Sequence, residues 1–148
     1  MEILLKQIGI IHTSLLDKKY APIQASRSDL PGSVEVFPEY LKGLEGIEEF
    51  SHIFLLYEFH LSEMGTPLMV QPFLDDKLHG IFATRYPNRP NPLGLSVVHL
   101  VSRQGAMLNF AGADMLDGTP LLDIKPYISE FDVFTVEKNG WYSERKFL

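Results

Sequence analysis

The sequence of 148 residues contains no cysteine. A chain without thiols cannot form disulfides, bind a metal through thiolates or use a cysteine as nucleophile. This excludes the disulfide-stabilised class of small domains and the thiol enzymes. The composition is compatible with a reducing compartment, and we expect the protein in the cytoplasm.

Long apolar runs are also missing. The N-terminal stretch MEILLKQIGIIHTS is apolar over too short a distance to cross a bilayer. It lacks the basic start and the small-residue cleavage site of a signal peptide. We therefore interpret it as a strand and expect no membrane association.

Several catalytic signatures are absent as well. The sequence has no HxH or HExxH spacing, so we expect no metal site. The glycine-rich loops of dinucleotide-binding and P-loop proteins are missing, and so is the GxSxG of hydrolases. The net charge of −6 argues against non-specific nucleic-acid binding, although it leaves room for a local basic patch.

What is present is an ordinary globular composition, with 45% hydrophobic and 22% charged residues. A chain of this length most simply forms one domain, and we expect residues 1–148 to do so. Such a domain buries about two thirds of its unfolded surface, which suffices for a core without disulfides.

Short apolar runs, separated by turn residues about every ten positions, predict an all-β sandwich or barrel. The predicted strands are residues 4–13, 33–37, 51–60, 78–84, 95–102, 106–113, 120–124 and 131–137. Residues 39–50 are the only helical stretch, and Gly43 and Gly46 limit it to one or two short turns. Asp117 and Gly118 predict a tight turn. Because a closed sheet removes exposed edges, we expect a single antiparallel β-barrel with long ordered loops at residues 16–30 and 64–77.

A rigid polar segment, ATRYPNRPNPLGL, runs from Ala83 to Leu95 between two predicted strands. Its three prolines fix the backbone and favour extended neighbours, so its side chains lose little entropy on binding a ligand. Arg85 can pair with a carboxylate or phosphate, and Arg89 can do the same or pair with an acid. The alternative is a stiff connector with solvated arginines.

Two further segments are candidate sites. The strand SHIFLLYEFH ends at His60, which can donate to a ligand or act as a base, or can be a half-exposed strand-end histidine. In AGADMLDGTPLLDIKPY, the small residues 111–113 allow a ligand close to the backbone, and three aspartates follow. The alternative there is a hairpin turn with an ion pair between Asp123 and Lys125. The small and polar loop at residues 21–27 is, taken alone, an ordinary loop.

ATRYPNRPNPLGLSVV, followed by GADMLDGTPLLDIKPY, strongly resembles the TsaA-like family, whose characterised members are TrmO-type tRNA methyltransferases. The resemblance extends to IGIIHT, FSHIFLLYEFH and the loop near Gln24, and so to nearly the whole chain. It implies an antiparallel β-barrel, a homodimer, and S-adenosylmethionine as the cofactor for methylating N6 of threonylcarbamoyladenosine beside the tRNA anticodon. Bacterial members usually continue into a further segment, whereas residues 129–148 follow the KPY motif here.

The resemblance also implies which residues contact the cofactor: Gln24, Ala25, Ser26, Arg27, His60, Leu61, Arg85, Leu95, Ala111, Gly112, Ala113 and Asp114. Candidate bases for the acceptor proton are His60, Asp114 and Tyr127, and candidate RNA-facing groups are Arg89, Asn91 and Lys125. Two other functions stay open. The chain can be a non-catalytic S-adenosylmethionine-binding module, or a dimeric scaffold whose loops are purely structural.

Overall fold

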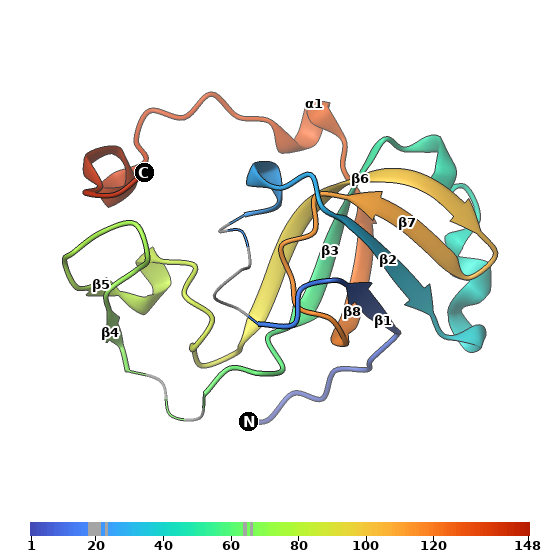
Figure 1. The fold of residues 1–148 in the computed structure, drawn as a ribbon, viewed down its shortest axis with the longest axis horizontal. Coiled ribbons are helices and arrows are strands. Elements are labelled where there is room, and N and C mark those ends of the chain that lie inside the picture. The colour runs from blue at the N-terminus through green and yellow to red at the C-terminus, as the bar shows by residue number, and fades with distance from the viewer. Residues whose placement is uncertain (18–21, 23, 64, 66) are drawn as a thin grey trace.

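The computed structural model describes residues 1–17, 22, 24–63, 65 and 67–148. Six strands close into an antiparallel barrel in the order β1-β2-β7-β6-β3-β8 (Figure 1). They are β1 (Gly9–Thr13), β2 (Pro31–Val36), β3 (His52–Glu58), β6 (Leu93–Gln104), β7 (Met107–Ala111) and β8 (Thr119–Pro126). The predicted all-β barrel is therefore confirmed. Within the described ranges, no helix has the length and apolar character needed to cross a bilayer.

The barrel forms because its strands alternate apolar and polar side chains. In β3 every second residue, Ile53, Leu55 and Tyr57, is buried, and the residues between them are half-buried or lie at the surface. The same alternation runs through most of β6. The inward side chains of all six strands meet in one core, which explains why a chain with few helices can bury enough apolar surface.

Close packing inside the barrel requires glycine at one important position. Gly94 in β6 lies opposite Tyr57 in β3, and a Cβ at Gly94 would overlap the tyrosine ring. The absence of a side chain therefore makes room for a large aromatic ring in the interior. That ring carries a hydroxyl group, which becomes important for the candidate site.

The predicted helical stretch is present as two 3₁₀ helices, η3 (Pro38–Leu44) and η4 (Ile47–Glu49). Gly46 separates them with a φ of 87°, a conformation that glycine adopts without strain. The predicted turn at Asp117 and Gly118 is also present, and Gly118 has a φ of 79°.

Two predicted strands are wrong. In residues 78–84 only β5 (His79–Gly80) is extended, and it pairs with β4 (Met69–Val70) outside the barrel. The chain then turns into the 3₁₀ helix η5 (Ile81–Ala83), where the Thr84 amide and hydroxyl both donate to the Ile81 carbonyl. This turn buries Ile81 and leaves Phe82 exposed, which a two-residue alternation cannot predict.

The second wrong strand is residues 131–137. They begin inside the short helix α1 (Ser129–Asp132), where the Asp132 carboxylate accepts a hydrogen bond from the Ile128 amide. After α1, Val133 is extended, but residues 133–137 belong to no strand, and Phe134 is 77% exposed. A high β-propensity alone therefore does not make a strand here, because a strand also needs a partner strand.

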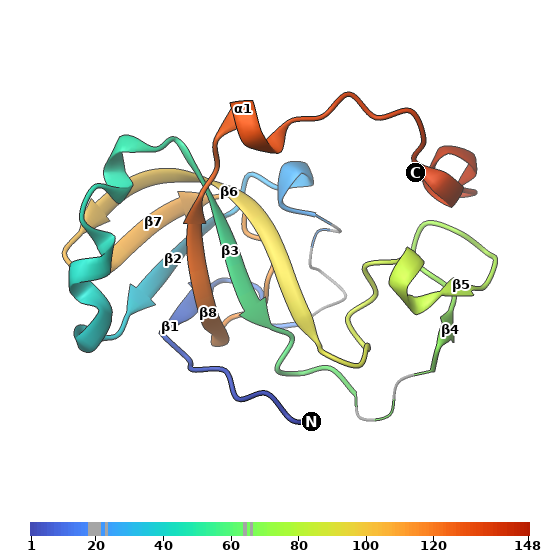
Figure 2. The same ribbon diagram turned by 180° about the vertical axis from the view of Figure 1, so that it is seen from behind.

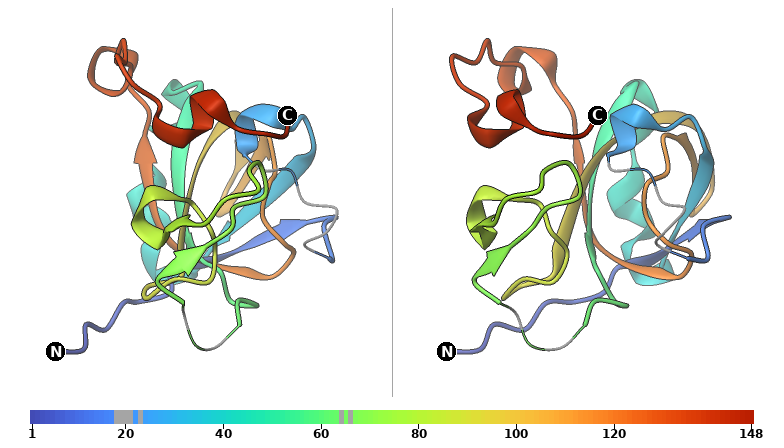
Figure 3. Two further views of the ribbon diagram at one scale, coloured as in Figure 1. Left: turned by 90° about the vertical axis from the view of Figure 1, so that its left-hand side faces the viewer. Right: turned by 60° about the vertical axis from the view of Figure 1, so that its left-hand side comes forward.

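The barrel occupies one side of the molecule, and the β4–β5 lobe (β4, β5 and η5) lies on the other side (Figures 1 and 2). After α1 the chain runs across to the lobe, where it ends in the 3₁₀ helix η6 (Gly140–Glu144) and the last four residues (Figure 3). The remaining 3₁₀ helix, η2 (Ala25–Arg27), lies against β6.

Candidate functional site

The candidate site depends on unequal strand lengths in the barrel. β6 has twelve residues and β7 has five. β3 pairs with residues 93–99 of β6, and β7 pairs with residues 99–104. Residues 93–98 of β6, which we call the open edge, therefore have no described strand on the β7 side. The chain that follows β7 and the loop that contains η2 both approach this edge.

Asp114 reaches the open edge through a chain of hydrogen bonds. The Ser96 hydroxyl donates to the Asp114 carboxylate at 2.7 Å, and the hydroxyls of Tyr57 and Ser96 lie 2.8 Å apart. Because Ser96 uses its hydrogen on the carboxylate, Tyr57 is the donor to Ser96. Burial and the negative charge of Asp114 both raise the pKa of Tyr57, so it stays protonated at neutral pH.

The small residues before Asp114 pack closely against the loop that follows η2. The amides of Gly112 and Ala113 both donate to the Leu30 carbonyl at 2.9 Å. The Ser28 hydroxyl donates to the Ala113 carbonyl at 2.7 Å. Gly112 has a φ of 102°, so a glycine suits this turn. The small side chains of residues 111–113 allow another part of the backbone to come close. In this structure the loop at residues 28–30 occupies that position.

Arg85 joins the proline-rich segment to the η2 loop. Its guanidinium donates to the Gln24 side-chain oxygen at 2.7 Å, across 61 positions of sequence. η2 follows at once, and the Arg27 amide donates to the Gln24 carbonyl. Ser26 lies within η2 and is exposed, and Ala25 begins it. The structure thus brings two separately predicted cofactor segments together.

His60, Leu61 and Leu95 lie nearby but have fewer contacts. His60 follows β3, and the preceding Phe59 amide donates to the Pro92 carbonyl, which holds this end of the strand against the proline-rich segment. Leu61 is 58% exposed and Leu95 is 56% exposed. Among the described contacts, none joins the His60 ring to another predicted site residue.

The candidate RNA-facing residues have different surroundings. Arg89 donates to the carbonyls of Thr84 and Tyr86 at 2.8 and 3.3 Å, so it stabilises its own loop. Asn91 is exposed in the same segment. Lys125 lies on β8, which is separated from β6 by β3. Its ammonium is 3.3 Å from the Asp123 carboxylate, so the ion pair that the sequence offered as an alternative is present.

The other aspartates and the third candidate base are part of the barrel wall. Asp117 accepts a hydrogen bond from the Thr13 amide at 3.0 Å and so holds the turn before β8 against β1. The Tyr127 ring packs against Phe54, with ring centres 5.5 Å apart. Only Asp114, of the three aspartates near one another in sequence, reaches the open edge.

Sequence reasoning missed Ser28, Tyr57 and Ser96. Ser96 had a detectable signal, because it is a polar residue at an inward position of an otherwise apolar strand, and buried polar groups need partners. Tyr57 carries no such signal, since a tyrosine is common in a core. Ser28 is one of many loop serines.

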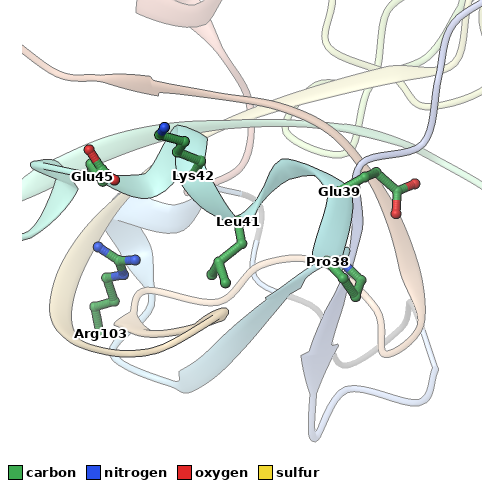
Figure 4. A pocket seen from close by; sticks show the side chains of 6 residues that line it. All are labelled: Pro38, Glu39, Leu41, Lys42, Glu45 and Arg103. Atoms are coloured by element: carbon green, nitrogen blue, oxygen red, sulfur yellow. The ribbon is translucent and has the colours of Figure 1, made fainter.

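The described residues contain no group of three His, Cys, Asp or Glu side chains that could hold a metal ion. A hollow at the opposite end of the barrel lies beside η3 (Figure 4). Its lining residues are Pro38, Glu39, Leu41, Lys42, Glu45 and Arg103. None of them is a predicted site residue. The predicted cofactor segments lie instead beside the open edge of β6, which Asp114 and the η2 loop both approach.

The fold and the candidate site together define the class. It is an antiparallel β-barrel protein in which the Asp114 carboxylate is bonded to an incompletely paired strand, and the η2 loop, linked to Arg85, lies against the same strand. Residues 10–133 match the family model of the tRNA-methyltransferase O N-terminal domain, and the chain belongs to this family. The resemblance read from the sequence is confirmed.

Relatives span a range of sizes. A probable S-adenosyl-L-methionine-binding protein of Pyrococcus abyssi is 54% identical over 92% of this chain and 74% of its own length. The human tRNA (adenine(37)-N6)-methyltransferase is 36% identical over 88% of this chain, which spans 31% of that enzyme. The crystal structure of TrmO from Pseudomonas aeruginosa has a TM-score of 0.77 at 35% identity and covers 95% of this chain and 62% of its own. These names support the predicted cofactor for the family.

The hydrogen-bond chain at the open edge predicts a stability effect. Ser96→Ala should lower the free energy of unfolding by about 1–3 kcal/mol, because it removes a donor to Asp114 and the partner of the buried Tyr57 hydroxyl. Urea denaturation measures this. Ser129→Ala, at an exposed position, is the matched control and should leave the midpoint unchanged. Equal midpoints for the two variants would contradict the role of Ser96.

Proposed function

We propose that this chain is an S-adenosylmethionine-dependent methyltransferase that methylates N6 of threonylcarbamoyladenosine beside the tRNA anticodon. One observation carries the proposal. Three side-chain hydrogen bonds, Arg85–Gln24, Ser28–Ala113 and Ser96–Asp114, join distant segments around one strand edge. The relatives' names supply the cofactor and the tRNA substrate.

The residues beside the open edge fit this cofactor chemically. S-adenosylmethionine carries a carboxylate, an ammonium group, ribose hydroxyls and an apolar adenine, and it supplies an electrophilic methyl group. The guanidinium groups of Arg27 and Arg85 suit the carboxylate, and Asp114 suits the ammonium group or a ribose hydroxyl. The exposed side chains of Leu61 and Leu95 suit the adenine. We infer that these residues bind and orient the cofactor.

Positioning is the main task of the protein in such a transfer, because the methyl donor is already activated. Gln24 holds the Arg85 guanidinium, and Ser96 holds the Asp114 carboxylate. His60, Asp114 and Tyr127 remain the candidate bases for the acceptor proton. Asn91 and Lys125 remain the candidate RNA contacts, with Arg89 fixing the loop that presents Asn91.

We further propose that residues 1–148 act as one domain in the cytoplasm and form a homodimer. Exposed apolar side chains on the β4–β5 lobe and after α1 support a protein partner; they include Phe82 and Phe134, each 77% exposed. Sedimentation equilibrium tests this proposal at micromolar concentration. The mass of two chains is expected, and a mass equal to one chain, 16.8 kDa, would contradict it.

Arg85 provides the direct test of cofactor binding. Arg85→Ala should weaken S-adenosylmethionine binding at least about tenfold, because a charge-assisted hydrogen bond contributes roughly 1.5–3 kcal/mol. Isothermal titration calorimetry measures the affinity. Lys42→Ala, at an exposed position in η3, is the control and should bind as the wild type does. An unchanged affinity for Arg85→Ala would remove this residue from the site.

The tRNA assay tests the reaction itself. Protein and S-adenosylmethionine are incubated with tRNA that carries threonylcarbamoyladenosine without the methyl group, and the nucleosides are then analysed by mass spectrometry. We expect the mass of the modified adenosine to rise by one methyl group. If the cofactor binds but no methylated nucleoside appears, the chain is a non-catalytic S-adenosylmethionine-binding module.

A further inference from the structure

We propose that Trp141 and Tyr142 in η6 are positioning residues that hold the two predicted cofactor segments, the η2 loop and the segment that begins at Ala83, in fixed relation to each other. The inference rests on the proposed function and adds residues to its site. η6 lies outside residues 10–133, the part of the chain that matches the family model.

Neighbouring side chains of η6 make one hydrogen bond to each segment. The Arg27 guanidinium donates to the Tyr142 hydroxyl at 2.8 Å. The Trp141 indole donates to the Ala83 carbonyl at 2.7 Å. Ala83 lies two positions before Arg85, which itself donates to Gln24 at the start of the η2 loop. The contacts therefore form a closed circuit through both segments and η6.

The C-terminal segment, residues 140–148, is itself held on the β4–β5 lobe. The rings of Trp141 and His79 stack with centres 4.9 Å apart and an angle of 19° between their planes. His79 also lies 2.7 Å from the Asp75 carboxylate, which accepts a hydrogen bond from the Lys146 amide. Further along, the Phe147 amide donates to the Leu74 carbonyl at 2.9 Å.

The charge of Asp75 helps to hold residues 140–148 on the β4–β5 lobe. The hydrogen bond from His79 is the main reason why the pKa of Asp75 lies below its usual value. Asp75 is therefore ionised at neutral pH and available as an acceptor for both the His79 ring and the Lys146 amide. At the end of η6, the Arg145 guanidinium lies 4.1 Å from the centre of the Tyr142 ring and donates to the Tyr142 carbonyl.

This circuit matters for cofactor binding because Arg27 and Arg85 are both exposed in the described structure. A hydrogen bond between exposed side chains is weak, and each flexible side chain loses entropy when a ligand fixes it. A second connection through a docked helix reduces that loss before the ligand arrives. Tyr142 thus acts through Arg27, and Trp141 acts through the backbone beside Arg85.

A double-mutant cycle tests this role. Tyr142→Phe removes the hydroxyl but keeps the ring against Arg145, and it should weaken S-adenosylmethionine binding about three- to tenfold, the worth of one hydrogen bond. In an Arg27→Gln background the same change should alter the affinity by less than about twofold, because its partner is gone. Tyr40→Phe, on η3 at the far end of the barrel, is the control and should bind S-adenosylmethionine as the wild type does.

Either of two affinity results would overturn the proposal: an unchanged affinity for Tyr142→Phe, or an equal loss in the wild-type and Arg27→Gln backgrounds. Trp141 is the single tryptophan, so its fluorescence reports whether η6 stays docked in each variant. An emission spectrum unchanged from the wild type is expected for Tyr142→Phe. A spectrum typical of exposed tryptophan would mean that the hydroxyl holds η6 itself, which contradicts a role restricted to Arg27.

A measurement without cofactor separates this inference from the proposed function. Amide hydrogen exchange of residues 24–30 should be faster in Tyr142→Phe than in the wild type, because Arg27 is no longer held. If the wild type does not bind S-adenosylmethionine but this difference is present, the cofactor assignment fails and the role of η6 in holding the loop is supported. If exchange is the same in both proteins, the role of η6 is contradicted whatever the ligand.

Discussion

The arrangement of the candidate site depends on one constraint, the mismatch between β6 and β7. Backbone donors and acceptors along residues 93–98 lack a described strand on one side, and the interior there contains the polar side chains of Tyr57 and Ser96. Buried polar groups need partners, so the chain after β7 bends across this edge and Asp114 accepts from Ser96. The irregular path that results brings a carboxylate to a place that a longer β7 would have covered.

Rigid and irregular parts have different tasks around this edge. The closed barrel fixes β6 on its β3 side. The η2 loop, which contains Arg27 and is linked to Arg85 through Gln24, lies against the same strand. Methyl transfer from an activated donor needs accurate placement more than it needs a strong acid or base. A site that offers two guanidinium groups and one anchored carboxylate is suited to that task.

The sequence predicted the parts of the molecule that obey local rules. Alternation identified β3 and β6, and Gly46 and Gly118 marked a break and a turn correctly. Residues 131–137 have the composition of a strand but pair with no described strand, and strand pairing is a property of the whole fold. The family resemblance placed Arg85 and Gln24 at one cofactor site, but it did not predict the hydrogen bond between them. The contacts of Trp141 and Tyr142 could not be predicted, because they depend on where the chain between α1 and η6 ends.

The central claim is that the open edge of β6 and the loops beside it bind the cofactor. Amide hydrogen exchange of the wild-type chain, with and without saturating S-adenosylmethionine, tests it most directly. Slower exchange is predicted for residues 24–30, 85–86, 93–98 and 111–114, with little change in η3 and η4. Protection confined to η3 and the hollow beside it, or no protection anywhere, would contradict the claim.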